Sequence, residues 1–320
     1  MHGRFIDTVA KIAIITTGGS MKRDFISIFD LSKKEMYDVF ELAQKLKESQ
    51  KKGVAHKILR DKTLAMVFEK PSLRTRVTFE TGMPQLGGHA IYLAPSDIKL
   101  GTRETVPDAA KNLSRWVDLI MARVFAHSTV TGLAENATIP VINGLSDLEH
   151  PCQVMCDLMT IIEHKKTLEK TRVTYVGDGN NVCNSLIAAS ALLGFALTIA
   201  TPKGYEPHKD YVVKAQKTHL THDPEEAVKD ADVVYTDVWA SMGQEQEAEK
   251  RRKVFSPFQL NTELLKHAKK DHVIMHCLPA HRGEEVTDDV IDGSHSIVFE
   301  QAENRLHIQK AIMVWLSQTS

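Results

Sequence analysis

The stretch Thr63-Leu64-Ala65-Met66-Val67-Phe68, followed closely by Ser72-Leu73-Arg74-Thr75-Arg76, decides the fold of the first half of this chain. The first six residues form an apolar run bounded by charge, which predicts a buried strand. Val77, Phe79 and Leu86 then lie in an apolar helical pattern that ends at a glycine pair. The sequence therefore predicts a buried strand that passes directly into a helix.

The start of this predicted helix carries groups suited to an anion. The first turn of a helix has unpaired N–H groups and the positive end of the helix dipole. Ser72 and Thr75 add hydroxyl groups, and Arg74 adds a guanidinium fork that matches phosphate geometry. The alternative is that Ser72 only caps the helix and the arginines are solvated. The pattern indicates a phosphate site, with this alternative left open.

Strand and helix patterns alternate through the first half of the chain. A capping box, Ser32-Lys33-Lys34-Glu35, opens a helix with one apolar stripe. Strands are then expected at residues 63–68, 89–93, 119–122 and 141–143. Helices are expected around residues 74–86, 106–115 and 129–136. Such alternation predicts a parallel sheet covered by helices on both faces.

The alternation restarts after a helix at residues 151–163 and a charged segment at 165–172. Further strands are expected at residues 173–176, 196–200, 233–236, 273–276 and 297–299. The predicted fold class is α/β, with two doubly wound parallel-sheet domains joined by helices and an active site in the cleft between them. We expect domains at 21–155 and 156–303, with a final helix at 304–320 packing back on the first.

Composition narrows the possible partners. The chain has 320 residues and a formal net charge of −1, so no global field favours nucleic acid or an acidic membrane surface. No run of about 18 apolar residues predicts a membrane span. Four cysteines predict a reducing, cytoplasmic setting rather than a disulfide framework. Residues 1–20 resemble neither a signal peptide nor the rest of the chain, and we expect a disordered extension there.

Polar groups recur where predicted strands end, which is where open α/β sheets bind their ligands. Arg123 follows the strand at 119–122, and His150 opens the helix after the strand at 141–143. Each has an ordinary alternative. Arg123 alone is compatible with a surface ion pair, and His150 alone with a packed or capping histidine.

The second half has three such strand ends. Residues 175–181 form a glycine-containing turn that weakly suggests nicotinamide-cofactor binding, but the third glycine and the acidic ribose partner are missing. Asn181, with Asn180 before it, is instead suited to an amino-acid carboxylate. Asp237 ends another strand and is suited to an ammonium group, with Ser241 and Met242 in the loop that follows.

The third strand end, at residues 276–283, contains two histidines and a cysteine. Cys277 has no obvious general-base partner in the sequence, so a nucleophilic role is poorly supported. Zinc binding by His276, Cys277 and His281 is an alternative with a generic spacing. Contact between Cys277 and a polar substrate is the simpler interpretation, and no metal or organic cofactor is expected.

Taken together, these elements resemble the aspartate/ornithine carbamoyltransferase family. The resemblance extends from about residue 21 to the C-terminus, in family order. It rests on Ser72-Leu73-Arg74-Thr75-Arg76, Met121-Ala122-Arg123, His150-Pro151-Cys152-Gln153, Asp178-Gly179-Asn180-Asn181, residues 237–243 and 276–283, and Glu303-Asn304-Arg305.

The resemblance implies transfer of the carbamoyl group of carbamoyl phosphate to the side-chain amine of L-ornithine, giving L-citrulline and phosphate, in arginine metabolism. The implied catalytic residues are Arg74, Arg123, His150, Asp237 and Cys277. The implied carbamoyl phosphate contacts are Ser72, Leu73, Arg74, Thr75, Lys99, Arg123, His150, Gln153, Cys277, Leu278 and Arg305. The implied ornithine contacts are Asn181, Asp237, Ser241 and Met242.

The resemblance also implies a homotrimer with shared active sites, in which Lys99 reaches the phosphate site of a neighbouring subunit. Partners are then the two small-molecule substrates, with no nucleic acid and no membrane. Two alternatives remain: carbamoylation of another amine such as putrescine, and a non-catalytic paralogue that senses one of the ligands.

Overall fold

The computed structural model describes residues 22–240 and 247–319, so the predicted extension at 1–20 lies outside the described residues. The described chain packs as two compact units. The first comprises residues 22–26, 34–146 and 306–319, and the second comprises 27–33 and 147–305. His150 and Gln153 pack with the second unit.

The first unit contains a four-stranded parallel sheet with the order β2-β1-β3-β4. Its strands are β1 (Thr63–Phe68), β2 (His89–Leu93), β3 (Leu119–Arg123) and β4 (Val141–Leu145). Residues 64–68 of β1 and all of β3 and β4 are buried, as expected for strands covered on both faces. Phe25 extends the sheet beyond β4, since its N–H donates to the carbonyl of Val141 at 2.9 Å.

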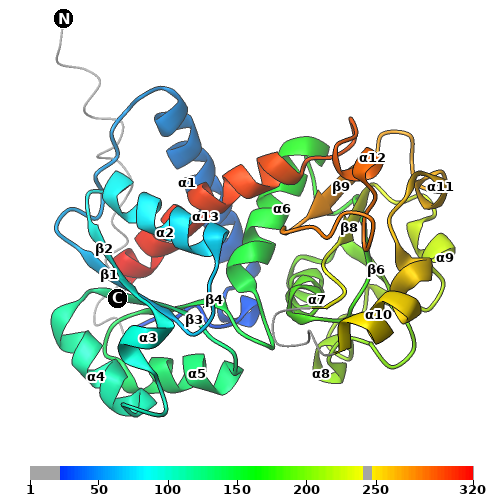
Figure 1. Ribbon diagram of the computed structural model, residues 1–320. Coiled ribbons are helices and arrows are strands. Elements are labelled where there is room, and N and C mark those ends of the chain that lie inside the picture. Colours follow the sequence, from blue (N-terminus) through cyan, green and yellow to red (C-terminus); the bar gives the residue numbers. More distant parts are fainter. Residues whose placement is uncertain (1–21, 241–246, 320) are drawn as a thin grey trace, which may run out of the picture. The chain divides into compact units, whose positions relative to one another are not determined.

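Helices cover both faces of this sheet (Figure 1). They are α1 (Lys33–Lys51), α2 (Leu73–Gln85), α3 (Pro95–Ile98), α4 (Val106–Trp116), α5 (His127–Asn136) and residues 306–319 of α13 (Val298–Thr319). Alternate residues of each strand face opposite sides. Ala65 and Val67 of β1 pack with Leu113 of α4 and Leu133 of α5 in one core cluster. Gly82 of α2 lies against α13, where an added Cβ would stand 3.1 Å from Lys310.

The second unit contains a five-stranded parallel sheet with the order β7-β6-β5-β8-β9. Its strands are β5 (Arg172–Val176), β6 (Ala196–Ala200), β7 (Thr218–Thr221), β8 (Val233–Thr236) and β9 (Val273–His276). The predicted α/β class, with two parallel sheets, is therefore confirmed.

The helices of the second unit differ in how deeply they are buried. They are η1 (Ile28–Asp30), α6 (Pro151–Lys165), α7 (Asn181–Leu193), α8 (Lys209–Val212), α9 (Pro224–Val228), α10 (Ala248–Phe255), η3 (Ser256–Phe258), α11 (Thr262–Leu265), α12 (Asp288–Ile291) and residues 298–305 of α13. Helices α6 and α7 are almost wholly buried, which explains why both are apolar around most of their circumference. Helices α9, α11 and α12 pack in one core cluster with β8 and β9.

One predicted strand is wrong and one strand was not predicted. Residues 297–299 were expected as a strand, but α13 begins at Val298 and Phe299 is 66% exposed. Extended pairing near this point is limited to a single bridge between Ile274 and Ser296. Strand β7 was missed because Thr218–Thr221 is short, mostly polar and at the sheet edge, so it lacks the apolar run of a buried strand.

Candidate active site

In the first unit, the predicted anion-binding residues lie at the topological switch point of the sheet. Strand β1 is flanked by β2 on one side and β3 on the other. Helix α2 starts shortly after β1, and Arg123 is the last residue of β3, in register with Phe68. Open α/β sheets bind ligands where the connections diverge from two neighbouring strands. The fold therefore brings the Ser72 segment and Arg123 to one place.

The hydroxyl groups of this segment are already ordered. Ser72 is the N-cap of α2, and its Oγ accepts from the N–H of Thr75 at 3.2 Å. Arg123 is 7% exposed, and its Nη1 lies 3.5 Å from Thr75 Oγ1. The capping role considered for Ser72 is thus real, and it holds the first turn of α2 beside a buried guanidinium group. A buried cation next to a helix N-terminus is a strong anion-binding arrangement.

The other residues predicted to contact carbamoyl phosphate in the first unit are less buried. Leu73 is 73% exposed, and Arg74, the second residue of α2, is half-buried. Arg76 is turned to other partners: its Nε lies 2.9 Å from Glu80 and its guanidinium 3.7 Å from the centroid of the Tyr92 ring. Lys99 caps α3 with a φ of 45° on an exposed turn.

In the second unit, Asp237 lies at the switch point between β5 and β8. Its carboxylate is 6% exposed and accepts three hydrogen bonds. Oδ1 accepts from the Cys277 thiol and from the N–H of Val238, each at 2.8 Å, and Oδ2 accepts from Asn180 Nδ2 at 2.7 Å. The Cys277 thiol is thus one of three donors that order the buried carboxylate of Asp237.

Sequence reasoning selected Asn181, whereas the structure places Asn180 in direct contact with Asp237. Asn180 is the N-cap of α7, and its Oδ1 accepts from the N–H groups of Val182 and Cys183. Asn181 is the first residue of that helix and is half-buried. The N-cap preference for asparagine was the available signal that Asn180 would be the ordered member of the pair.

The glycine-containing turn after β5 is shaped by the protein's own chain. A Cβ on Gly179 would lie 2.2 Å from the backbone nitrogen of Pro207, and the N–H of Gly179 donates to the carbonyl of Tyr205. Gly179 therefore admits the segment at 205–207, not a cofactor pyrophosphate. The close approach of this segment explains a glycine at position 179 without a nicotinamide cofactor.

Asp178, in the same turn, forms a buried ion pair with Arg251 of α10 at 3.0 Å. Burial raises the pKa of Asp178 to about 6, and the positive charge of Arg251 opposes that rise. Arg251 Nη1 also donates to the carbonyl of Trp239 at 2.8 Å. Arg251 thus ties the turn after β5 to the segment after β8, and sequence reasoning missed it because its partners are distant in the chain.

His276 ends β9 and has both ring nitrogens engaged. Its Nδ1 accepts from the N–H of Leu278 at 2.8 Å, so Nε2 carries the proton and faces Glu285 Oε1 at 3.1 Å. Leu278 adopts a φ of 56° and precedes a cis proline. With neither ring nitrogen of His276 available as a ligand, this geometry disfavours the zinc interpretation and fixes the turn that carries Cys277.

Three further predicted residues meet inside the second unit. His150 is the N-cap of α6, and its N–H donates to Ser185 Oγ at 3.0 Å. Gln153, one turn into α6, accepts through Oε1 from Nη1 of the buried Arg305 on α13. Ser241 and Met242, the remaining predicted ornithine contacts, lie outside the described residues.

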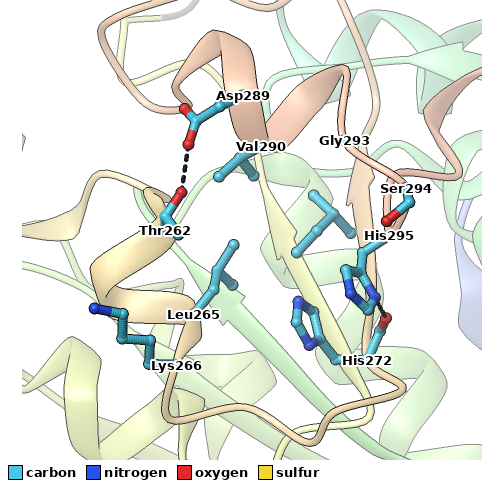
Figure 2. A pocket seen from close by; sticks show the side chains of 10 residues that line it. Thr262, Leu265, Lys266, His272, Asp289, Val290, Gly293, Ser294 and His295 are labelled. Carbon is cyan, nitrogen blue, oxygen red and sulfur yellow. Dashed lines mark hydrogen bonds between the residues drawn. The ribbon is translucent and has the colours of Figure 1, made fainter.

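The second unit also has a hollow of about 320 Å³ that contains none of the predicted site residues (Figure 2). Its floor is apolar, from Leu265, Ile274 and Val290. His272 and His295 stack at one side with ring centroids 4.3 Å apart, and each Nδ1 hydrogen-bonds a backbone carbonyl. The paired imidazoles are committed to the fold, so the switch-point cluster remains the better candidate site.

Fold and site together define a two-unit α/β protein with a cluster suited to an anion in one unit and an acidic cluster suited to an amine in the other. Two family models match the chain. One describes the carbamoyl-P binding domain of aspartate/ornithine carbamoyltransferases over residues 23–163, and the other describes their Asp/Orn binding domain over residues 169–316. The chain belongs to the aspartate/ornithine carbamoyltransferase family.

Individual relatives support the same conclusion. The chain is 56% identical over 302 residues to an ornithine carbamoyltransferase of Pyrococcus horikoshii, covering 92% of this chain and 95% of that protein. It is also 56% identical to an anabolic ornithine carbamoyltransferase of Pyrococcus furiosus, covering 91% of this chain and 95% of that one. The solved structure of ornithine carbamoyltransferase from P. furiosus is similar with a TM-score of 0.89, covering 92% and 97% of the two chains.

A structure of ornithine carbamoyltransferase from Thermus thermophilus, 45% identical, gives a TM-score of 0.84 and covers 92% of this chain and 98% of that one. Among the described residues, the helices contain no segment with the length and apolar character needed to cross a membrane.

Proposed function

We propose that this chain transfers the carbamoyl group of carbamoyl phosphate to the side-chain amine of L-ornithine, producing L-citrulline and phosphate. The observation that carries the proposal is the pair of switch-point clusters with opposite chemical preference. One presents Ser72, Thr75 and the buried Arg123 to an anion. The other presents the buried carboxylate of Asp237 to a cation. Carbamoyl phosphate and ornithine have these charges.

Carbamoyl phosphate is held in two parts under this proposal. Ser72, Leu73, Arg74, Thr75 and Arg123 bind the phosphate through first-turn N–H groups, hydroxyls and guanidinium groups. The carbamoyl end meets a second set: His150, Gln153, Arg305 and the backbone at Cys277 and Leu278. Buried, ordered donors of this kind stabilise the charge that develops on the carbonyl and leaving-group oxygens.

Ornithine is bound by Asn181, Asp237, Ser241 and Met242. Asp237 and Cys277 orient its amines, and Asn180 holds the Asp237 carboxylate in position. A side-chain ammonium with a pKa near ~10.4 costs about 4 kcal/mol to deprotonate near neutral pH. Removal of water from the bound amine lowers that cost, and proximity of the two substrates supplies much of the remaining acceleration.

An amine panel tests the proposed reaction. Purified protein is supplied with carbamoyl phosphate and with ornithine, N-acetylornithine or putrescine, and the carbamoylated products are measured. We expect kcat/KM for ornithine to exceed that for putrescine at least a hundredfold, because putrescine leaves the polar amino-acid contacts unpaired. Preference for putrescine would assign a different amine, and binding without any product would favour a ligand-sensing paralogue.

We also propose that the chain forms a homotrimer in which Lys99 contributes to the phosphate site of a neighbouring subunit, and that it works in the cytoplasm. The exposed position of Lys99 supports the first, and four free cysteines support the second. Light scattering on the purified protein is expected to give three times the chain mass of 35.8 kDa. A monomer with full activity would contradict a shared site.

A further inference from the structure

Asp157 is a fully buried carboxylate on α6 that the proposed chemistry does not use directly. Three donors converge on it. Its Oδ1 accepts from Gln153 Nε2 and from Gln301 Nε2, each at 2.7 Å, and its Oδ2 accepts from the Tyr235 hydroxyl at 2.9 Å. An ionised carboxylate only accepts hydrogen bonds, so this set of donors matches its charged form.

The position of Asp157 fixes which way the Gln153 amide points. The NH₂ group of Gln153 must face the accepting carboxylate, and its carbonyl oxygen must face the donating guanidinium of Arg305. One amide N–H then remains to donate to a ligand. Without Asp157, the amide could rotate by half a turn and present its NH₂ group to Arg305, where no hydrogen bond is possible.

The same carboxylate fixes Gln301 on α13. Gln301 donates to Asp157 and accepts through Oε1 from the N–H of His276 at 3.0 Å. His276 in turn holds the turn of Cys277 and Leu278 through its Nδ1. Asp157 therefore connects, within the second unit, three segments that carry candidate contacts: the start of α6, the end of β9 and α13.

We propose that Asp157 is the positioning residue for the carbamoyl end of carbamoyl phosphate: it orients Gln153, and through it Arg305, while Gln301 holds the Cys277 turn. This inference rests on the proposed function. Asp157 acts through these side chains and does not contact the substrate. The proposed phosphate contacts are Ser72, Arg74, Thr75 and Arg123, which belong to the first unit. Binding of inorganic phosphate is therefore expected not to depend on Asp157.

Calorimetric titration without ornithine tests the inference independently of turnover. The probes are carbamoyl phosphate and inorganic phosphate, and the variants are Asp157→Asn and Asp157→Leu. Asn keeps one acceptor for the two glutamine amides, whereas Leu removes every acceptor at similar volume. We expect the Kd for carbamoyl phosphate to rise about tenfold in D157N and at least a hundredfold in D157L, with the Kd for phosphate within twofold of wild type.

The matched control is Thr160→Val. Thr160 is equally buried on the same helix; its hydroxyl donates to the carbonyl of Cys156 at 2.8 Å and accepts from Asn304 Nδ2 at 3.0 Å, with no hydrogen bond to Gln153 or Gln301 among the described residues. T160V is expected to bind both probes as wild type does, even if it lowers the melting temperature. If D157L fails to fold, the tenfold loss of carbamoyl phosphate affinity expected in D157N still tests the positioning role of Asp157.

Two results would overturn the inference: unchanged carbamoyl phosphate affinity in D157N, or equal weakening of both probes. Citrulline formation by the wild type is measured in parallel. If carbamoyl phosphate binding weakens in D157N as expected but the wild type forms no citrulline, the proposed reaction is wrong and the positioning role of Asp157 stands. If the wild type forms citrulline but D157N binds carbamoyl phosphate as wild type does, the proposed reaction stands and the positioning role of Asp157 is wrong.

Discussion

Arg74 and Arg76 are two residues apart in one motif, but the structure gives them different surroundings. Arg76 lies over the ring of Tyr92 and pairs with Glu80 on the outer side of α2. Arg74 is the second residue of α2, next to the buried Thr75 that contacts Arg123. The motif alone offers two equivalent guanidinium groups, and the fold separates them.

We therefore expect Arg74→Ala to lower kcat by at least a hundredfold, because one preorganised donor to developing charge contributes that much in comparable sites. Arg76→Ala is the matched comparison and should lower kcat at most about tenfold. Citrulline formation measures both, and circular dichroism verifies the fold. Equal losses in the two variants would show that the distinction between the arginines is wrong.

Asp157 also makes stability depend on pH. Burial raises its pKa to about 7, against hydrogen bonds from Gln153, Gln301 and Tyr235 and the charge of Arg305, all of which lower it. A carboxyl whose pKa is higher in the folded state binds its proton more tightly there, so its stabilising effect is complete below about pH 4 and is lost as pH rises through 7.

Urea unfolding gives the free energy of unfolding of wild type and of Asp157→Asn. The value for wild type minus the value for the variant should fall by roughly 3–4 kcal/mol between pH 4 and pH 8. The difference between the two proteins, rather than either curve alone, isolates this carboxyl from the other titrating groups. A difference that stays constant across that range would mean that Asp157 keeps an ordinary pKa in the folded protein.

At the scale of elements, the turn after β5 depends on a close approach between two backbone segments. A Cβ at Gly179 would meet Pro207 N at 2.2 Å and Tyr205 O at 2.6 Å, so Gly179→Ala must displace the segment at 205–207 or the start of α7. We expect a loss of about 1–3 kcal/mol in unfolding free energy, as for other overpacked sites. The KM for ornithine should rise because Asn180 shifts.

Gly204→Ala is the control for this prediction. Gly204 lies directly before the segment at 205–207 and has a φ of 87°, but a Cβ there would have no atom within 4 Å. Its cost should be limited to backbone strain of about 1 kcal/mol, and the KM for ornithine should not change. Equal KM values for wild type and G179A would show that the turn does not position the amine site.

Most elements could be predicted from the sequence because the strands of both sheets are short apolar runs bounded by turns. Strands β1, β2, β6, β8 and β9 have the predicted bounds. The error at 297–299 arose because Ile297 and Val298 are apolar and buried, and a short apolar run does not distinguish a strand from the first turn of a helix such as α13. Edge strand β7 is too polar to stand out.

The position of the candidate site residues at strand ends was also predictable, since position relative to a strand is a local property. Asp157, Gln301 and Arg251 were not. Gln301 and Asp157 are 144 positions apart in the chain and meet only after α6 and α13 have packed. Supporting residues of this kind have no local motif, and their importance is visible only in the hydrogen bonds they make. The roles assigned to the predicted contacts remain proposals.

At the scale of the whole molecule, each unit has its own parallel sheet, its own core and its own switch-point cluster. Under the proposed function, the cluster of the first unit takes the anionic substrate and the cluster of the second takes the amine. We propose that the carbamoyl group passes directly from one substrate to the other, with Cys277 serving as a hydrogen-bond donor to Asp237. Direct transfer requires both substrates to be bound at once.

Initial rates of citrulline formation, measured while carbamoyl phosphate and ornithine are both varied, test this claim most directly. We predict intersecting double-reciprocal lines and no phosphate release above the non-enzymatic rate when ornithine is omitted. Parallel lines, or phosphate release accompanied by a carbamoylated Cys277 in the absence of ornithine, would contradict direct transfer between two complementary clusters.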